Sequence, residues 1–133
     1  MTHSSIKKRL GMSGIKYLAD TNCFIYLLDE NPLLLPFASE NWAYCYITEI
    51  ELLSKKDLSS AEESLIREML DTCYKINHTQ LLTDLAINLK RKNNIKLPDA
   101  IIAASAQLMH LPLLTADKGF SNVKGIDCIL LDF

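Results

Sequence analysis

The chain has 133 residues and a mass of 15.0 kDa, which suffices for one domain with a sizeable core but not for two ordinary domains. Apolar residues make up 49% of the sequence and charged residues 23%, and this balance excludes intrinsic disorder and fibrous classes. The formal net charge of −2 gives no general attraction to nucleic acids, so RNA binding would require a local basic patch.

Signals for export and for thiol chemistry are weak along the whole sequence. No stretch of about 18 uncharged apolar residues occurs, and no apolar segment follows the basic residues near the N-terminus. Neither a membrane span nor a signal peptide is therefore predicted. The four cysteines are widely spaced in apolar contexts without a C-x-x-C pair, which indicates buried thiols in a cytoplasmic protein.

The first half of the chain predicts a tail, two strands and three helices. Residues 1–14 are polar and without periodicity, so we expect a flexible tail, in which Met12 is an alternative start to Met1, before a single domain over 15–133. A strand is expected to end at Asp20 and to lead into an apolar helix that stops by residue 28. The aromatic and β-branched run 44–47 predicts a second strand, and helices are expected from Thr48 and from Ser60.

The second half continues the alternation of strands and helices. The expected strands are 73–76, 112–115 and 127–131, the expected helices are 81–92 and 98–108, and 118–122 reads as a loop or short turn. The second of these helices is apolar almost all round and should be buried centrally. The pattern predicts an α/β fold, a three-layer α/β/α sandwich with a mostly parallel sheet of four to five strands.

Four acidic residues stand where this fold would place a site. Asp20 and Asp117 follow expected strands, and Glu51 and Asp99 lie near the starts of helices. Because parallel strands present their carboxyl ends at one edge, the four side chains can converge there and offer hard oxygen ligands for Mg²⁺ or Mn²⁺. Without a cation, carboxylates crowded in this way would repel one another.

Each acid also has a purely structural interpretation. Asp20 could cap a helix, and Asp99 could be a first-turn carboxylate favoured by the helix dipole. Thr48 and Glu51 fit the S/T-x-x-E capping box, which is the better interpretation of Glu51 taken alone. Asp117 lies in ordinary turn composition. The functional hypothesis therefore depends on the combination of positions.

The order of these segments resembles the PIN-domain ribonucleases, especially the VapC-type toxins of toxin–antitoxin operons, over residues 16–131. Asp20-Thr21-Asn22 with the apolar helix after it resembles the family's opening motif, and Ile47-Thr48-Glu49-Ile50-Glu51-Leu52 resembles its second, which selects Glu51 over Glu49. Pro98-Asp99-Ala100 and Thr115-Ala116-Asp117 resemble the third and the last. Gly119 departs from the family, in which a further acid is common at that position.

The resemblance implies a metal-dependent endoribonuclease and names its parts. One or two Mg²⁺ or Mn²⁺ ions would be held by Asp20, Glu51, Asp99 and Asp117. Asn22 and Thr115 would orient ligands or the attacking water, with turn capping as their alternative role. The implied partners are an RNA substrate, a cognate antitoxin protein and a second copy in a homodimer, with no membrane.

Two questions stay open at this level. The RNA-binding patch is predicted at Lys90, Arg91, Lys92, Lys96 and Lys118, although lysines at a helix end are more often simply solvated. The alternative functions are a catalytically inactive PIN-like binding module and, less favoured, a Mg²⁺-binding receiver-type signalling domain. A receiver would need an aspartate after its middle strand, where this chain has Asn77 and His78.

Overall fold

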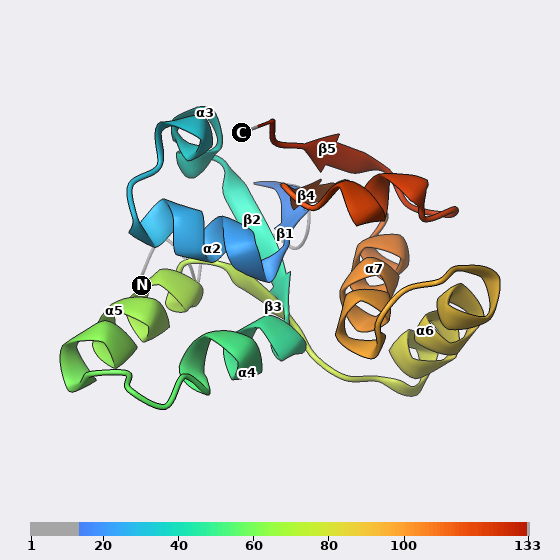
Figure 1. The fold of residues 1–133 in the computed structure, drawn as a ribbon, viewed down its shortest axis with the longest axis horizontal. Helices are drawn as coiled ribbons and strands as arrows, with labels where there is room; N and C mark the ends of the chain where they lie inside the picture. Colours follow the sequence, from blue (N-terminus) through green and yellow to red (C-terminus); the bar gives the residue numbers. More distant parts are fainter. Residues whose placement is uncertain (1–13, 133) are drawn as a thin grey trace.

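Five parallel strands form the centre of the computed structural model, which describes residues 14–132. The order across the sheet is β3-β2-β1-β4-β5 (Figure 1). The bounds are β1 (Ile15–Ala19), β2 (Asn41–Cys45), β3 (Tyr74–Ile76), β4 (Leu113–Thr115) and β5 (Cys128–Leu130). The tail expected over 1–14 lies, except for its last residue, outside the described part of the chain.

Helices cover both faces of this sheet. Figure 1 shows α6 and α7 on one side and α2, α3, α4 and α5 on the other. Their bounds are α2 (Thr21–Leu28), α3 (Leu35–Ala38), α4 (Tyr46–Leu53), α5 (Ser60–Asp71), α6 (Gln80–Lys92) and α7 (Leu97–Met109). Short 3₁₀ turns, η2 (Pro32–Leu34) and η3 (Lys118–Asn122), complete the chain. The predicted three-layer sandwich is confirmed, and all of its strand pairs are parallel.

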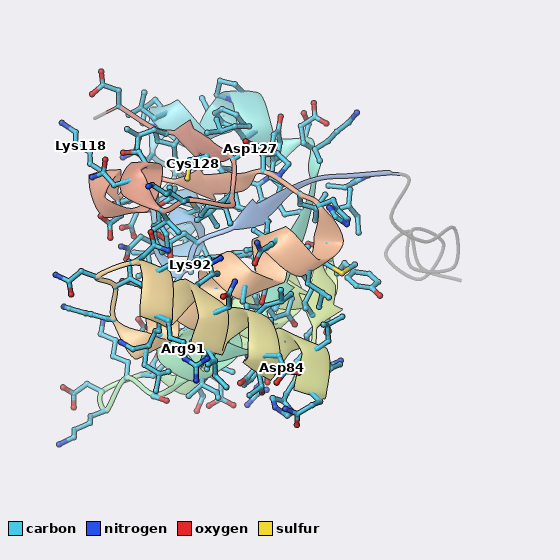
Figure 2. The ribbon with its side chains drawn as sticks, turned by 90° about the vertical axis from the view of Figure 1, so that its right-hand side faces the viewer. Asp84, Arg91, Lys92, Lys118, Asp127 and Cys128 are labelled. Atoms are coloured by element: carbon cyan, nitrogen blue, oxygen red, sulfur yellow. The ribbon has the colours of Figure 1, made fainter. Side chains whose placement is uncertain are left out.

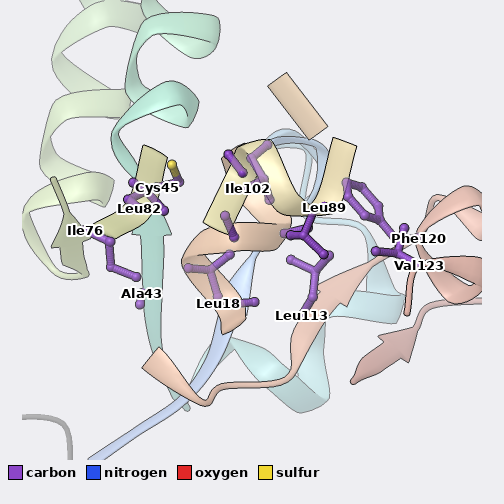
Figure 3. Close-up of a cluster of buried hydrophobic side chains, with 14 of the residues drawn as sticks. Leu18, Ala43, Cys45, Ile76, Leu82, Leu89, Ile102, Leu113, Phe120 and Val123 are labelled. Carbon is purple, nitrogen blue, oxygen red and sulfur yellow. The ribbon is translucent and has the colours of Figure 1, made fainter. Parts of the chain in front are cut away.

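The two layers of core follow from the alternation of side chains along the strands. Leu18 points to one face of the sheet, where it meets Leu89 of α6 and Ile102 of α7 (Figure 3). The next residue, Ala19, points to the opposite face and joins the cluster around Phe24. Both faces of the sheet are thus covered by buried apolar side chains. Polar functional residues are therefore expected at the ends of the strands.

Local signals explain most helix limits. Ser59 caps α5 through a capping box, in which its hydroxyl accepts from the Glu62 N–H at 3.1 Å and the Glu62 carboxylate accepts from the Ser59 N–H at 3.1 Å. The Thr79 hydroxyl caps α6 in the same position. In α7, Pro98 lies in the first turn, and the residues from Ile102 to Ala106 are buried, so the expected central helix is confirmed.

The second strand lies earlier than predicted, at Asn41–Cys45 rather than 44–47. Because Asn41 is polar, the sequence pattern did not indicate that the strand begins there. In the structure its side-chain amide donates to the Gly14 carbonyl at 2.7 Å, and its backbone pairs with Ile15. Tyr46 and Ile47 are helical despite their β propensity, because both pack against the core on the α6 and α7 side. Tertiary packing has overridden local preference here.

Two early exclusions can be compared with the structure. Among residues 14–132, no helix combines the length and the apolar character that a membrane crossing requires. Cys23 and Cys45 are fully buried, Cys73 is nearly so, and Cys128 is half-buried, in agreement with the expectation of buried thiols.

Candidate active site

The strand order reverses between β1 and β4, which are neighbours in the sheet although they are far apart in sequence. In open α/β sheets, ligands bind outside the carboxyl ends of the strands at such a switch point. Asp20 directly follows β1, and its N–H donates to the Leu114 carbonyl of β4 at 3.0 Å. Asp20 therefore stands where the topology leaves room for a ligand.

A buried hydroxyl holds the Asp20 carboxylate in place. The Thr115 Oγ1 donates to Asp20 Oδ2 at 2.8 Å and accepts from the Asp117 N–H at 3.0 Å. Thr115 is fully buried and Asp20 is 5% exposed. Asp20 occupies the position before α2, yet its side chain makes no capping bond to that helix. Its carboxylate is thus held by β4 through the Thr115 hydroxyl.

Burial raises the pKa of Asp20 from 3.8 to about 6. The hydrogen bonds from the Thr115 hydroxyl and the Thr21 N–H favour the ionised form and oppose this rise, whereas the charges of Asp99 and Asp117 add to it. These couplings place Asp20, Asp99 and Asp117 within electrostatic reach of one another. The site concentrates negative charge in a partly desolvated position.

Glu51 does not take part in a capping box. The residue before α4 is Cys45, so Thr48 lies inside the helix, and no side chain caps this end. Thr48 and Glu51 are one turn apart and share a helix face. On that face Thr21 Oγ1 donates to Glu51 Oε1 at 2.6 Å and lies 2.9 Å from Thr48 Oγ1. The capping interpretation is wrong because the cap position of α4 is Cys45, three residues before Thr48.

Asp99 lies in the first turn of α7 and is half-buried. Burial raises its pKa, and the charges of Asp117 and Glu51 raise it further, whereas Lys96 lowers it. Asp99 therefore experiences the carboxylates that follow β2 and β4 in the chain. The dipole of α7 also favours its charge, so the two interpretations of this residue are compatible.

Asp117 serves its own turn as well as facing the site. Its Oδ1 accepts from the Gly119 N–H at 2.8 Å and caps η3. A Cβ on Gly119 would lie 3.1 Å from the same oxygen, which is tighter than an ordinary contact. The absence of a side chain at 119 thus lets the turn close on the Asp117 carboxylate.

The comparisons with known proteins identify the family of the chain. The family model of the PIN domain matches residues 17–126, which include all four acids. The chain belongs to the PIN-domain family. No curated protein sequence shows significant similarity to it. The family predicted from the motif order is thereby confirmed.

This PIN domain is similar to chains in solved structures of toxin–antitoxin complexes. A chain of the "toxin-antitoxin complex from Klebsiella pneumoniae" is 32% identical with a TM-score of 0.72, and the match covers 84% of this chain and 95% of that one. VapBC2 from Rickettsia felis, bound to a promoter DNA fragment, matches at 22% identity and a TM-score of 0.75 over 89% and 99%. A chain of DNA-bound VapBC from Salmonella typhimurium is 17% identical with a TM-score of 0.74, and the match covers 89% of this chain and 99% of that one. The last two matches show the shared fold alone.

The basic residues expected to bind RNA differ in how they are placed on this PIN domain. The Lys90 ammonium donates to the Ile95 carbonyl at 2.8 Å and so braces the connection between α6 and α7. Lys96 is exposed, directly precedes α7 and is the base whose charge lowers the pKa of Asp99. Figure 2 labels the other three, Arg91, Lys92 and Lys118. Asn22 is exposed on the first turn of α2.

The donor set of the PIN domain fits a hard divalent cation. All four side chains offer carboxylate oxygens, which suit Mg²⁺ and Mn²⁺ better than softer metals. Within residues 14–132, no three His, Cys, Asp or Glu side chains are close enough together to enclose an ion by themselves. Mg²⁺ is ordinarily bound by one or two carboxylates and keeps several waters, so an open acidic edge is compatible with it.

Sequence reasoning missed Thr21 and the true role of Thr48. Thr21 stood between two residues already singled out, and its spacing alone gave no reason to pair it with Glu51, 30 positions away. The adjacency of β1 and β2 brings the helices that follow them together, and this adjacency was not predicted. The contact of Thr21 with Thr48 and Glu51 could have been predicted only from the strand order together with the first residue of α4.

Proposed function

We propose that this PIN domain is a metal-dependent endoribonuclease and the toxin component of a type II toxin–antitoxin pair. The observation that carries the proposal is the gathering of acids at the switch point, where the Thr115 hydroxyl joins the Asp20 carboxylate to the Asp117 backbone. Burial raises the pKa of both Asp20 and Asp99, and the charges of neighbouring carboxylates raise it further. A fold gains nothing from assembling like charges in a desolvated place, so the cluster points to a cation ligand.

Asp20 and Asp99 would hold the cation, with Glu51 and Asp117 as the flanking ligands for one or two Mg²⁺ or Mn²⁺ ions. When bound, the ion lowers the pKa of a coordinated water and neutralises charge on the scissile phosphate. The chain itself contributes orientation. Thr115 fixes the Asp20 carboxylate, and Asn22, exposed on the first turn of α2, is placed to hydrogen-bond substrate or water.

The test is RNA cleavage by purified protein with Mg²⁺ or Mn²⁺ and with excess EDTA. We expect cleavage only with metal, and we expect Asp99→Asn to abolish it. Asp84→Asn is the matched control, because Asp84 is an exposed aspartate of α6 outside the acidic edge. Undiminished cleavage in EDTA, or by the Asp99→Asn variant, would contradict the proposal. Metal binding without cleavage of any RNA would favour the inactive binding module.

The antitoxin is proposed to lie in a groove between α2, α4 and α5. This groove has a volume of about 580 Å³, and its charged lining consists of the acids Asp29, Glu51 and Glu62 and one base, Lys55. Its apolar lining comprises Ile25, Leu28, Leu52, Leu58, Leu65 and Ile66. An amphipathic segment with a basic residue would fill the groove and bring its cation to Glu51.

Co-expression with the product of the neighbouring reading frame tests the antitoxin proposal. The two proteins should co-purify and the complex should show no cleavage, whereas Leu65→Glu in the toxin should abolish co-purification. Leu65 is 53% exposed, so this change should leave the fold intact. Co-purification unaffected by Leu65→Glu would place the antitoxin elsewhere.

A homodimer is proposed from the same family resemblance. The second copy has a candidate surface in an apolar groove of about 400 Å³ between α6 and α7, where Ile87 and Leu97 are exposed. Sedimentation at micromolar concentration should show a dimer, and a monomer would remove this part of the proposal.

A further inference from the structure

Three oxygen-bearing side chains from two helices form a continuous chain beside the acidic edge. Thr21 opens α2 directly after β1, and Thr48 and Glu51 lie in α4 directly after β2. The distances are 2.9 Å between the two hydroxyl oxygens and 2.6 Å from Thr21 Oγ1 to Glu51 Oε1. Because β1 and β2 are adjacent, this chain joins the elements that follow two neighbouring strands.

The direction of the hydrogen bonds follows from the number of protons available. An ionised carboxylate only accepts, so the single hydroxyl proton of Thr21 goes to Glu51. The Thr21 oxygen is then an acceptor for Thr48, whose hydroxyl is fully buried and has no water to donate to. The chain therefore runs from Thr48 through Thr21 to Glu51 and ends on a negative charge.

Thr21 links two of the four acids. Its hydroxyl donates to Glu51, and it directly follows Asp20 in the chain, where its backbone N–H favours the ionised form of the Asp20 carboxylate. One residue thus sets the relative placement of the acids that follow β1 and β2. A glutamate as exposed as Glu51 would otherwise sample several rotamers at little cost in free energy.

We propose that Thr21 and Thr48 are positioning residues that fix Glu51 in one rotamer for a divalent cation. Oε1 is the oxygen bound by Thr21, so Oε2 would be the oxygen available to a cation. Hydrogen bonds of this kind orient metal ligands, and their loss typically weakens metal affinity by about 10- to 100-fold. The inference rests on the proposed function, because it assumes that the acidic edge binds a cation.

The competing explanation is a purely structural one, in which the hydroxyl chain only joins α2 to α4. That role predicts a loss of stability in every variant that lacks a hydroxyl, with metal affinity unchanged in the folded fraction. The two explanations therefore differ in the affinity for metal and not in stability. Thr21→Val and Thr21→Ser separate them, since valine keeps the shape of threonine and serine keeps its hydroxyl.

The experiment is calorimetric titration of the metal-free full chain with Mn²⁺, with the thermal unfolding midpoint of each variant measured in parallel. We expect Thr21→Val to bind Mn²⁺ about 10- to 100-fold more weakly than wild type and Thr21→Ser to bind nearly as well. Thr48→Val should show a smaller loss, because it leaves the Thr21 bond to Glu51 intact. Thr72→Val is the control. The Thr72 hydroxyl donates to the Met69 carbonyl, and Thr72 lies just before β3, at the amino ends of the strands and away from the acidic edge.

The outcomes separate the inference from the proposal beneath it. Equal affinities of wild type and Thr21→Val would overturn the positioning role alone, as would equally weak binding by Thr21→Val and Thr21→Ser. An absence of Mn²⁺ binding by wild type would overturn the proposed function itself and the positioning role with it. Should Thr48→Val fail to fold, the Thr21 pair still decides the matter, because Thr21 is only half-buried.

Discussion

Asp20 shows most clearly how one residue is held in an unfavourable state. It is buried, four other groups of the site influence it electrostatically or by hydrogen bonding, and its pKa of about 6 lies above the ordinary 3.8. A folded-state pKa above the unfolded value means that the folded protein binds the proton more tightly. Ionisation of Asp20 therefore opposes folding, and a bound cation would remove that opposition.

The stability of the metal-free protein should consequently fall as pH rises. Below pH 3.8 Asp20 is protonated in both states and its contribution to stability is fully present, and it is lost as pH rises through about 6. The loss corresponds to about 3 kcal/mol at neutral pH. Asp20→Asn keeps an acceptor for Thr115 and removes the charge, so it should raise the free energy of unfolding at pH 7.

Chemical denaturation of wild type and Asp20→Asn at pH 4 and pH 7, both in EDTA, measures this effect. The difference between the two proteins should be larger at pH 7 than at pH 4. A variant that is less stable than wild type at pH 7, or a difference independent of pH, would show that the folded protein does not disfavour the ionised form of Asp20.

Gly119 and Asp117 illustrate what a sequence pattern can and cannot say about a single residue. The turn composition around Asp117 correctly indicated a turn, since the carboxylate caps η3. The same carboxylate is one of the charges that raise the pKa of Asp99. Capping the turn and adding charge to the acidic edge are therefore compatible roles for Asp117, because its carboxylate has two oxygens.

At the scale of elements, the first residue of α4 decides between two interpretations that the spacing of Thr48 and Glu51 allows. The S/T-x-x-E pattern describes both a capping box and two residues on one face inside a helix, and only the first helical residue distinguishes them. Ser59 and Glu62 form the former, and Thr48 and Glu51 form the latter. The start of α4 could not be predicted, because Tyr46 and Ile47 look like strand residues and become helical through packing.

The connection from α6 to α7 carries the proposed contact with RNA. Lys96 is the base that influences Asp99, and Lys90 is engaged with the Ile95 carbonyl, so Lys96 is placed to contact a phosphate beside the acids. Lys96→Ala should weaken binding of single-stranded RNA regardless of sequence and reduce the log–log salt slope by roughly 0.7. Replacing Lys90, Arg91 and Lys92 together should flatten it further.

Fluorescence anisotropy across a series of salt concentrations, in EDTA to prevent cleavage, gives these slopes. Lys16→Ala is the control, because Lys16 is exposed at the amino end of β1, away from the acidic edge. If the slopes of Lys96→Ala and of the triple variant both equal that of wild type, the basic stretch is a solvated helix end and RNA is held elsewhere.

At the scale of the whole molecule, the layered α/β class could be predicted, because alternating strand and helix patterns and an α7 that is apolar almost all round admit few other arrangements. The strand order β3-β2-β1-β4-β5 could not, since pairing of parallel strands leaves no local signal. That order makes β1 and β4 neighbours and puts Asp20 beside Thr115. The convergence of acids was thus expected from a general rule, whereas their hydrogen-bond partners required the structure.

The carboxyl edge of this sheet is proposed to be one cation site shared by Asp20 and Asp99. Diffraction from Mn²⁺-soaked crystals, recorded where manganese scatters anomalously, shows whether an ion binds there. We expect an anomalous peak at the β1–β4 switch point in contact with carboxylate oxygens of both residues, and its loss in Asp99→Asn crystals. No peak at this edge, or a peak that misses either carboxylate, would show that the two residues do not share a cation.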